Sequence, residues 1–180
     1  MKLIQLVIKS LPLLLAALVG VCAVSSQSLW IDEGVEAMYA MQPTLHAWWH
    51  SLRVAGDSNL QILPQLFFLW GWEKVFGASE IALRAANVPC FLVALLALRW
   101  GLARTKYAAW MLMAAATSPF LWYYMGEARP YAFLFATTCL AAAPLFRLLL
   151  ADDAPCGPAF SSEVFGALCI GSVLLSATSI

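Results

Sequence analysis

The chain has 180 residues, of which 63% are hydrophobic and only 11% are charged, and its mean hydropathy is +0.81. A soluble domain is usually about half apolar and about a quarter charged, so this composition predicts a polytopic integral membrane protein, all-α in fold. The 10 basic and 10 acidic residues cancel, which gives no reason to expect nucleic acid as a partner. An odd number of cysteines without a C-x-x-C pair argues against both a disulfide framework and a zinc site.

The first predicted span covers residues 10–29, which carry no charge. A run of this length can cross about 30 Å of hydrocarbon as a helix. A cleaved signal peptide is the alternative, because VCAVSS resembles a cleavage site. The length of the run and the spans that follow it favour a retained helix.

Four more spans are predicted, which gives about five in total: residues 85–103, 107–125, 131–150 and 162–180. Arg99 lies close enough to the end of its span for the side chain to reach the interface. Between the last two spans, ADDAPCGPAF carries acids, Pro and Gly and is typical of a loop. The last run reaches the chain terminus without a flanking loop, so we expect the chain to be the N-terminal part of a longer protein.

Residues 30–84 form the first external loop, with juxtamembrane helices. Its segment 58–77 contains Gln61, Gln65, Glu73 and Lys74, which favours a helix lying in the interface over one that crosses. If it does not cross, six basic residues are cytoplasmic and four external; if it crosses, the division is five and five. Only the first arrangement makes the cluster RWGLARTK cytoplasmic, together with the N-terminus. The first loop and the later stretch GEARPY then face the same external side.

Three acids, Asp32, Glu33 and Glu36, follow the first span in SLWIDEGVEAMYA, with no basic residue among them. Ile31 and Val35 begin an apolar stripe of a predicted helix, and the acids share a second face. A solvated polar face that stops the span from sliding inward is one interpretation. The other is a site that contains a carboxylate suited to act as a general base.

The stretch WYYMGEARPY places Glu127 and Arg129 at the end of a charge-free span. Ionisable groups at such a depth are costly and usually functional, although Arg129 could simply bond Glu127. On one side of the membrane with Asp32, they form a candidate site: a base, a second acid, and a cation suited to phosphate. His46 and His50 have a metal-ligand spacing, but their tryptophan neighbours are more typical of an amphipathic interfacial helix.

Three stretches, in order between about residues 29 and 150, resemble the C-type glycosyltransferase superfamily. They are the acidic pair DE after the first span, LPQLFFLWGWEKVFGASEIALRAANV, and SPFLWYYMGEARPYAFLF. The similarity is to the bacterial branch that includes protein mannosyltransferases and the aminoarabinose transferase. Two departures are that Pro64 stands alone where many members carry His-Pro or Pro-Pro, and that family members are several hundred residues long.

The resemblance implies an enzyme of a bacterial inner membrane, with its N-terminus in the cytoplasm. It would move a sugar from a polyprenyl-phosphate donor to an unidentified glycan, lipid or protein acceptor on the external side. Asp32 and Glu33 would be catalytic, and Glu127, Arg129 and Tyr131 would bind the donor's lipid phosphate. The acids would be unpaired because they await a hydroxyl and a phosphate.

Two questions stay open at this point. Asp32, Glu33 and Glu127 could hold a divalent cation such as Mg²⁺ or Mn²⁺, but the same acids suit metal-free base catalysis. The alternative to an enzyme is a non-catalytic polytopic membrane protein, a lipid-binding or transporter-like fragment whose acids are rim charges.

Overall fold

The computed structural model describes residues 2–56, 58–103, 105–149 and 162–177, and all regular elements within them are helices. The prediction of an all-α fold is therefore confirmed. The helices are α1 (Lys2–Ala23), α2 (Ile31–Ala40), α3 (Leu45–Ala55), η1 (Ser58–Ile62), α4 (Leu63–Phe76), α5 (Glu80–Ala85), α6 (Asn87–Gly101), α7 (Ala108–Ala116), α8 (Pro119–Met125), α9 (Tyr131–Leu149) and α10 (Ser162–Ser176).

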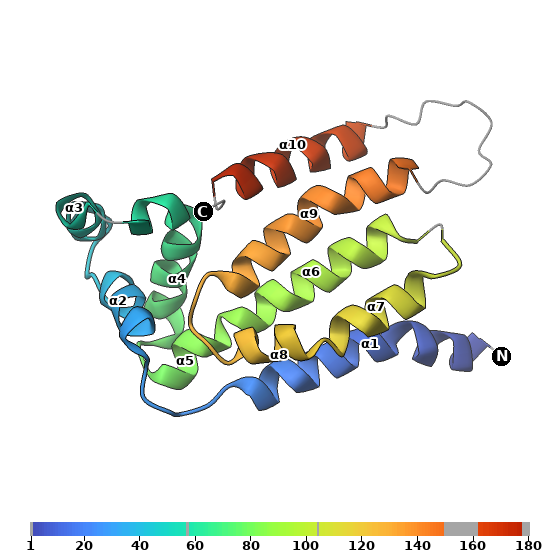
Figure 1. The fold of residues 1–180 in the computed structure, drawn as a ribbon, viewed down its shortest axis with the longest axis horizontal. Coiled ribbons are helices and arrows are strands. Elements are labelled where there is room, and N and C mark those ends of the chain that lie inside the picture. The colour runs from blue at the N-terminus through green and yellow to red at the C-terminus, as the bar shows by residue number, and fades with distance from the viewer. Residues whose placement is uncertain (1, 57, 104, 150–161, 178–180) are drawn as a thin grey trace.

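Within the part of the chain that the structure describes, five passes of helix run side by side and alternate in direction: α1, α6, α7 followed by α8, α9, and α10 (Figure 1). Small residues let these helices approach closely. A Cβ atom added at Gly101 would lie 2.6 Å from the carbonyl oxygen of Ala143, and one at Gly171 would lie 2.6 Å from the Cα of Ala141. The backbones of α6 and α10 thus both lie directly against α9.

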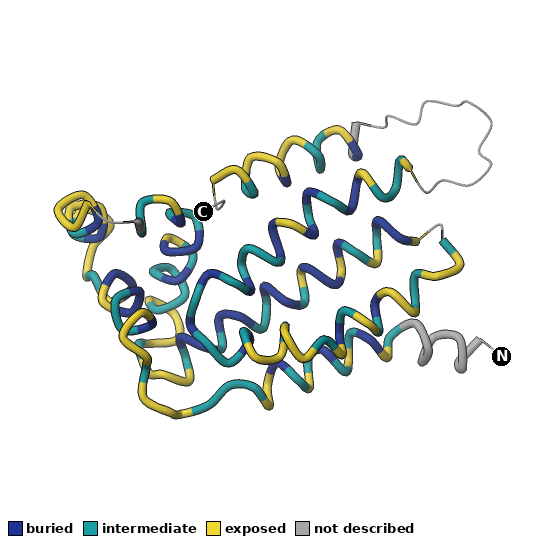
Figure 2. The backbone as a smooth tube through the Cα atoms, viewed as in Figure 1, coloured by how far each residue is buried: buried dark blue, intermediate teal, exposed yellow. Residues whose placement is uncertain are grey.

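Two helical stretches in the described residues are long and apolar enough to cross a membrane, Glu80–Gly101 and Tyr131–Leu149. The apolar helices Ser10–Ala23 and Val164–Ser176 are shorter. The turns that face outward are mostly exposed and those between the helices are mostly buried (Figure 2). Many of the exposed residues are large and apolar, such as Leu14, Trp110 and Phe165.

Two predicted spans differ from the helices observed. The first helix ends at Ala23 instead of residue 29, because Arg84 binds the carbonyls of Ser25, Gln27 and Ser28 and holds residues 24–30 outside the helix. The predicted span 107–125 is broken into α7 and α8 at Thr117 and Ser118. Pro119 accounts for that break, since proline disfavours the helical conformation in the residue before it.

The other predicted spans correspond to single helices or nearly so. Residues 85–103 correspond to α6, which α5 precedes with almost no break, and residues 131–150 correspond to α9. The last span, 162–180, corresponds to α10 over Ser162–Ser176. The predicted loop at 151–160, Arg104 and residues 178–180 lie outside the described residues.

The first predicted loop folds into a layer of short helices, α2 to α5, over one end of the bundle (Figure 1). Helix α4 lies across that end instead of running alongside α6 and α9, and its Phe68 packs against Phe133 of α9 with ring centroids 5.7 Å apart. Residues 126–130, which join α8 to α9, lie at this same end, whereas the connection between α6 and α7 lies at the opposite end (Figure 1). The first loop and the connection between α8 and α9, which are far apart in sequence, therefore meet at the end of the bundle where α2 lies.

Candidate functional site

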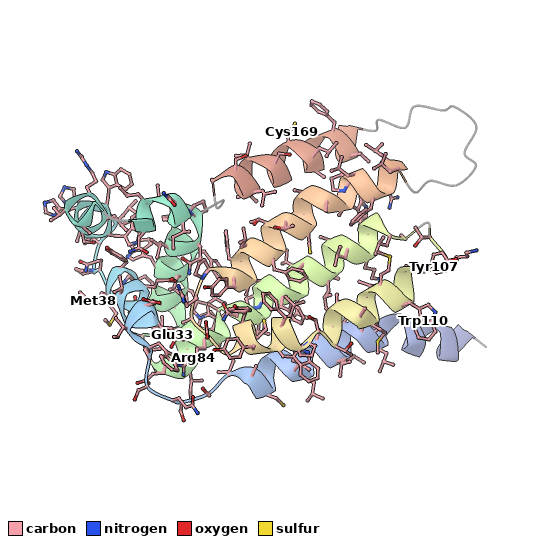
Figure 3. All side chains as sticks on the ribbon, viewed as in Figure 1. Glu33, Met38, Arg84, Tyr107, Trp110 and Cys169 are labelled. Carbon is pink, nitrogen blue, oxygen red and sulfur yellow. The ribbon has the colours of Figure 1, made fainter. Side chains whose placement is uncertain are left out.

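The centre of this end layer is an ion pair between Glu33 of α2 and Arg84 of α5, which lie side by side (Figure 3). The two side chains are 0% and 2% exposed. Arg84 Nε donates to Glu33 Oε1 at 3.1 Å, and Nη2 donates to Oε2 at 2.9 Å. This bidentate geometry is the strong form of an arginine–carboxylate pair.

Each oxygen of Glu33 accepts a second hydrogen bond from the backbone. The N–H of Ala128 donates to Oε1 at 2.6 Å, and the N–H of Trp30 donates to Oε2 at 2.9 Å. Burial alone would raise the pKa of Glu33, but the hydrogen bonds from Arg84, Ala128 and Trp30 outweigh it and hold the pKa below its ordinary value. Glu33 is thus a buried carboxylate that ties α2 to α5 and to the α8–α9 connection.

Asp32, the preceding residue, points the other way. Its side chain is 65% exposed, and its Oδ2 lies 3.3 Å from Nη1 of Arg129. The expectation that the acids of the first loop lack basic partners is therefore wrong. Glu33 pairs with Arg84 and Asp32 pairs with Arg129, residues too distant in sequence for the local pattern to reveal them.

Asp32, Glu127 and Arg129 line one cavity of about 140 Å³, together with Trp30 and Tyr123. The sequence predicts that the first loop and the connection between α8 and α9 share a site. Each of them thus contributes a carboxylate to this cavity, and a guanidinium lies between the two segments. The amide of Asn87 on α6 holds this connection in place by donating to the carbonyls of Met125, at 3.1 Å, and of Glu127. The N–H of Arg129 donates to the Glu127 carbonyl at 2.8 Å, which makes the loop a tight turn.

The ring of Tyr131 packs against the guanidinium of Arg129. The guanidinium carbon of Arg129 lies 5.1 Å from the centroid of the Tyr131 ring, within range of a cation–π contact. The same ring packs against Tyr124 at 4.2 Å between centroids. Both tyrosines also line an apolar cavity of about 280 Å³ between α6, α8 and α9, whose walls include Phe91 and Phe135. Arg129, which lines the polar cavity, thus contacts Tyr131, which lines the apolar cavity.

Glu36, one helical turn beyond Asp32, is buried beneath this site at 4% exposure. Its Oε2 accepts a hydrogen bond of 2.8 Å from Nε2 of Gln65 on α4. Burial raises the pKa of Glu36 to about 8, although the Gln65 hydrogen bond and the charge of Arg129 both lower it. At neutral pH this carboxyl is mostly protonated.

The described residues contain no group of three or more His, Cys, Asp or Glu side chains placed to hold a metal ion. The predicted set of Asp32, Glu33 and Glu127 does not converge, because both Glu33 oxygens already accept two N–H donors each. His46 and His50 stack on each other on the outer face of α3, with ring centroids 6.5 Å apart. Because Glu33 is already fully bonded, Asp32, Glu33 and Glu127 do not fit a shared divalent cation.

Sequence reasoning gave no role to Arg84 or Gln65. Arg84 lies 51 residues from Glu33, and only its place in the stretch that resembles the glycosyltransferase superfamily singles it out. Gln65 is a polar residue in an apolar helix, so a buried partner is the expected consequence. Comparison of the chain with protein-family models, curated proteins and solved structures found no match in any of the three.

Proposed function

We propose that this chain is a glycosyltransferase, or the part of one that holds the donor, and that it uses a polyprenyl-phosphate sugar as donor. The observation that carries the proposal is the contact between Arg129 and Tyr131. Arg129 lines a cavity with two carboxylates, and Tyr131 lines one with aromatic and aliphatic walls. That combination suits an amphiphile with an anionic head and a hydrocarbon tail, in which the phosphate contacts Arg129 and the chain follows the apolar wall.

The chemistry follows from the positions of the charged groups. A hydroxyl of the acceptor attacks the anomeric carbon of the donor sugar from the face opposite the phosphate, with inversion. Asp32 Oδ2, exposed at the rim, takes the proton of that hydroxyl as the new carbon–oxygen bond forms. The bond between the anomeric carbon and the phosphate oxygen breaks, and the guanidinium of Arg129 stabilises the charge that the leaving phosphate gains.

The contact between Asp32 and Arg129 is compatible with these separate roles. Its 3.3 Å distance is long for a charge-assisted hydrogen bond, and the side chains are 65% and 32% exposed. Exposed pairs of this kind contribute only about 0–1 kcal/mol, so an arriving phosphate can take the guanidinium at little cost. Asp32 is then released to act as the base.

Glu33 has a positioning role in this proposal. Its oxygens are fully engaged and its side chain is 0% exposed, so it meets neither acceptor nor donor. By holding Ala128 and Arg84, it fixes the distance between α2, which carries Asp32, and the turn that carries Arg129. Glu127 lines the same cavity as Asp32, and in this proposal it binds a hydroxyl of the donor sugar.

The proposed setting is a bacterial inner membrane that the five helical passes cross, with the N-terminus cytoplasmic. The end layer of α2 to α5 then lies at the external interface, with α4 along the membrane plane. Trp49, Trp122 and Tyr123 are exposed, as an aromatic belt would be. Arg99, Lys106 and Arg147 belong to the other end of the bundle, which this orientation makes cytoplasmic.

Donor binding tests the proposal with no knowledge of the acceptor. Native mass spectrometry of the purified chain in detergent would compare a polyprenyl phosphate with the polyprenol of the same length. We expect the phosphate to bind more tightly, and Arg129→Gln to remove roughly a ten- to hundredfold preference, the value of a hydrogen bond to a charged group. Arg53→Gln, which removes an exposed arginine of the same end layer, should keep the preference.

A second measurement addresses Asp32. With water in place of the acceptor, release of polyprenyl phosphate from a polyprenyl-phosphate hexose should be slow but measurable. Asp32→Asn should lower that rate by about 10²- to 10⁴-fold while the donor still binds, because only the proton-accepting group is lost. Equal binding of phosphate and polyprenol, in both the wild type and Arg129→Gln, would instead favour a non-catalytic membrane protein.

A further inference from the structure

Arg129 interacts with two acids of α2 that differ sharply in depth. Asp32 and Glu36 are four residues apart, so they share one face of the helix. The Asp32 side chain is 65% exposed, whereas Glu36 is 4% exposed. Arg129 pairs with Asp32 through Nη1, and its charge also acts on Glu36, whose pKa it lowers. The guanidinium is therefore within electrostatic reach of a rim carboxylate and of an interior carboxyl.

The hydrogen bonds around Glu36 are incomplete. Among the described residues, the buried Nε–H of Arg129 and the buried Oε1 of Gln65 have no hydrogen-bond partner. A buried donor without a partner costs about 1–3 kcal/mol. A movement of the guanidinium that brings its Nε–H to an acceptor would therefore be favourable. Glu36, held by Gln65 at 2.8 Å, is the nearby group that becomes a strong acceptor when it ionises.

We propose that Glu36 is a positioning residue for Arg129, whose guanidinium faces Asp32 at the rim while Glu36 is neutral and turns inward to Glu36 when that carboxyl is charged. In the outer position, Nη1 is available at the polar cavity. In the inner position, Nε–H donates to Glu36 and the cavity loses its cation. The consequence for donor phosphate rests on the proposed function, but the two positions of Arg129 do not.

Other charged groups near Glu36 are already engaged or lie elsewhere. On α2, Asp32 and Glu33 raise the pKa of Glu36 by repulsion, and on α4 the neutral amide of Gln65 donates a hydrogen bond to it. The remaining charged or titratable side chains of the adjoining elements have other partners or positions. On α4, Glu73 and Lys74 pair with each other, and Lys74 also bonds the Ala40 carbonyl. On α5, Arg84 is bonded to Glu33 and Glu80 is exposed; Glu127 lies beside Arg129; and His46, His50 and Arg53 lie together on α3. Among the described residues of these elements, Arg129 is the cation whose charge acts on Glu36.

Carbon-detected NMR of arginine side chains tests this directly, because it does not depend on N–H protons that exchange rapidly at high pH. The full chain, labelled with ¹³C and ¹⁵N arginine in lipid nanodiscs, would be titrated from pH 6 to pH 9.5, with Arg129→Lys used for assignment. We expect the Nε–Cζ peak of Arg129 to shift with a midpoint near pH 8, the pKa of Glu36. Glu36→Gln, which keeps an oxygen for Gln65, should abolish the shift.

The Arg84 peak is the internal control, since its partner Glu33 stays ionised throughout this range. A flat Arg129 peak in the wild type, or a shift that survives in Glu36→Gln, would overturn the proposal. If Glu36→Gln fails to fold, as a displaced Arg84 peak would reveal, Glu36→Met provides the same comparison. Affinity for a polyprenyl-phosphate hexose should fall at least tenfold between pH 7 and pH 9 in the wild type only. A titrating Arg129 with constant affinity would support the two positions and contradict phosphate binding at Arg129.

Discussion

Replacing Glu33 with glutamine should destabilise the protein far more than the same change at its neighbour Asp32. The Glu33 carboxylate accepts four N–H donors, two at each oxygen: Arg84 Nε and Ala128 N at Oε1, Arg84 Nη2 and Trp30 N at Oε2. In Glu33→Gln one oxygen becomes an NH₂ group. Whichever way the amide is oriented, that NH₂ faces two donors and can accept from neither.

The magnitude follows from this count. Two hydrogen bonds that involve a charged group are lost, at about 1.5–3 kcal/mol each, which gives roughly 3–6 kcal/mol. The result agrees with the range of about 3–5 kcal/mol for breaking a buried ion pair by removing one partner. Asp32→Asn removes only an exposed pair and should cost about 1 kcal/mol or less.

Unfolding by added denaturing detergent, followed by the fluorescence of the eight tryptophans, measures both variants in the same micelles. A cost for Glu33→Gln no larger than that for Asp32→Asn would refute the reasoning. The pH dependence gives a second check. Because the folded pKa of Glu33 lies below its unfolded value of 4.5, its stabilisation is present above pH 4.5 and is lost as the pH falls below that value. Glu33→Gln should lack this acid-sensitive component.

Three further predictions follow from other parts of the structure. Glu36→Gln should leave stability unchanged near pH 4 and raise it relative to wild type at pH 8. The reason is that a folded pKa of about 8 makes wild-type stability decline as the pH rises from 4.5 toward 8. An equal pH slope of stability in both proteins would contradict this. Gly101→Ala should cost about 1–3 kcal/mol in the detergent assay, since its Cβ would meet the backbone of α9, whereas Gly34→Ala, with no atom within 4 Å, should cost nothing. In a background without native cysteines, an impermeant maleimide on intact cells should label Ser79→Cys and leave Thr105→Cys unlabelled, and the reverse pattern would refute the proposed orientation.

The sequence was sufficient for the helical class and for the grouping of the two loops. Apolar run length predicted α9 almost to the residue. The polar residues of segment 58–77 predicted a helix that does not cross the membrane, and in the structure α4 lies across the end of the bundle (Figure 1). The ends of the other elements depended on contacts that a local pattern does not contain. Helix α1 ends six residues early because a side chain 59 positions from Ser25 takes up the backbone carbonyl there.

The same limit applies to the site. Residue type and order pointed to Asp32, Glu127 and Arg129, and the structure brings these three into one cavity. Pairing was the part that could not be predicted, because it joins residues 51 to 97 positions apart through tertiary packing. A run of adjacent acids without a local base is therefore weak evidence that the acids are free.

The contrast between Asp32 and Glu33 shows how one helix supports two opposite uses of a carboxylate. Adjacent residues on an α-helix point about 100° apart, so when α2 packs against α5 only one of the two can face inward. The inward acid gains four donors and becomes a fixed anion of low basicity, because its folded pKa is depressed. The outward acid keeps water access and a single long contact to Arg129, which leaves a lone pair for a proton. A rotation of α2 by one residue would exchange these roles, so the tight Glu33–Arg84 contact is also what keeps Asp32 facing the cavity.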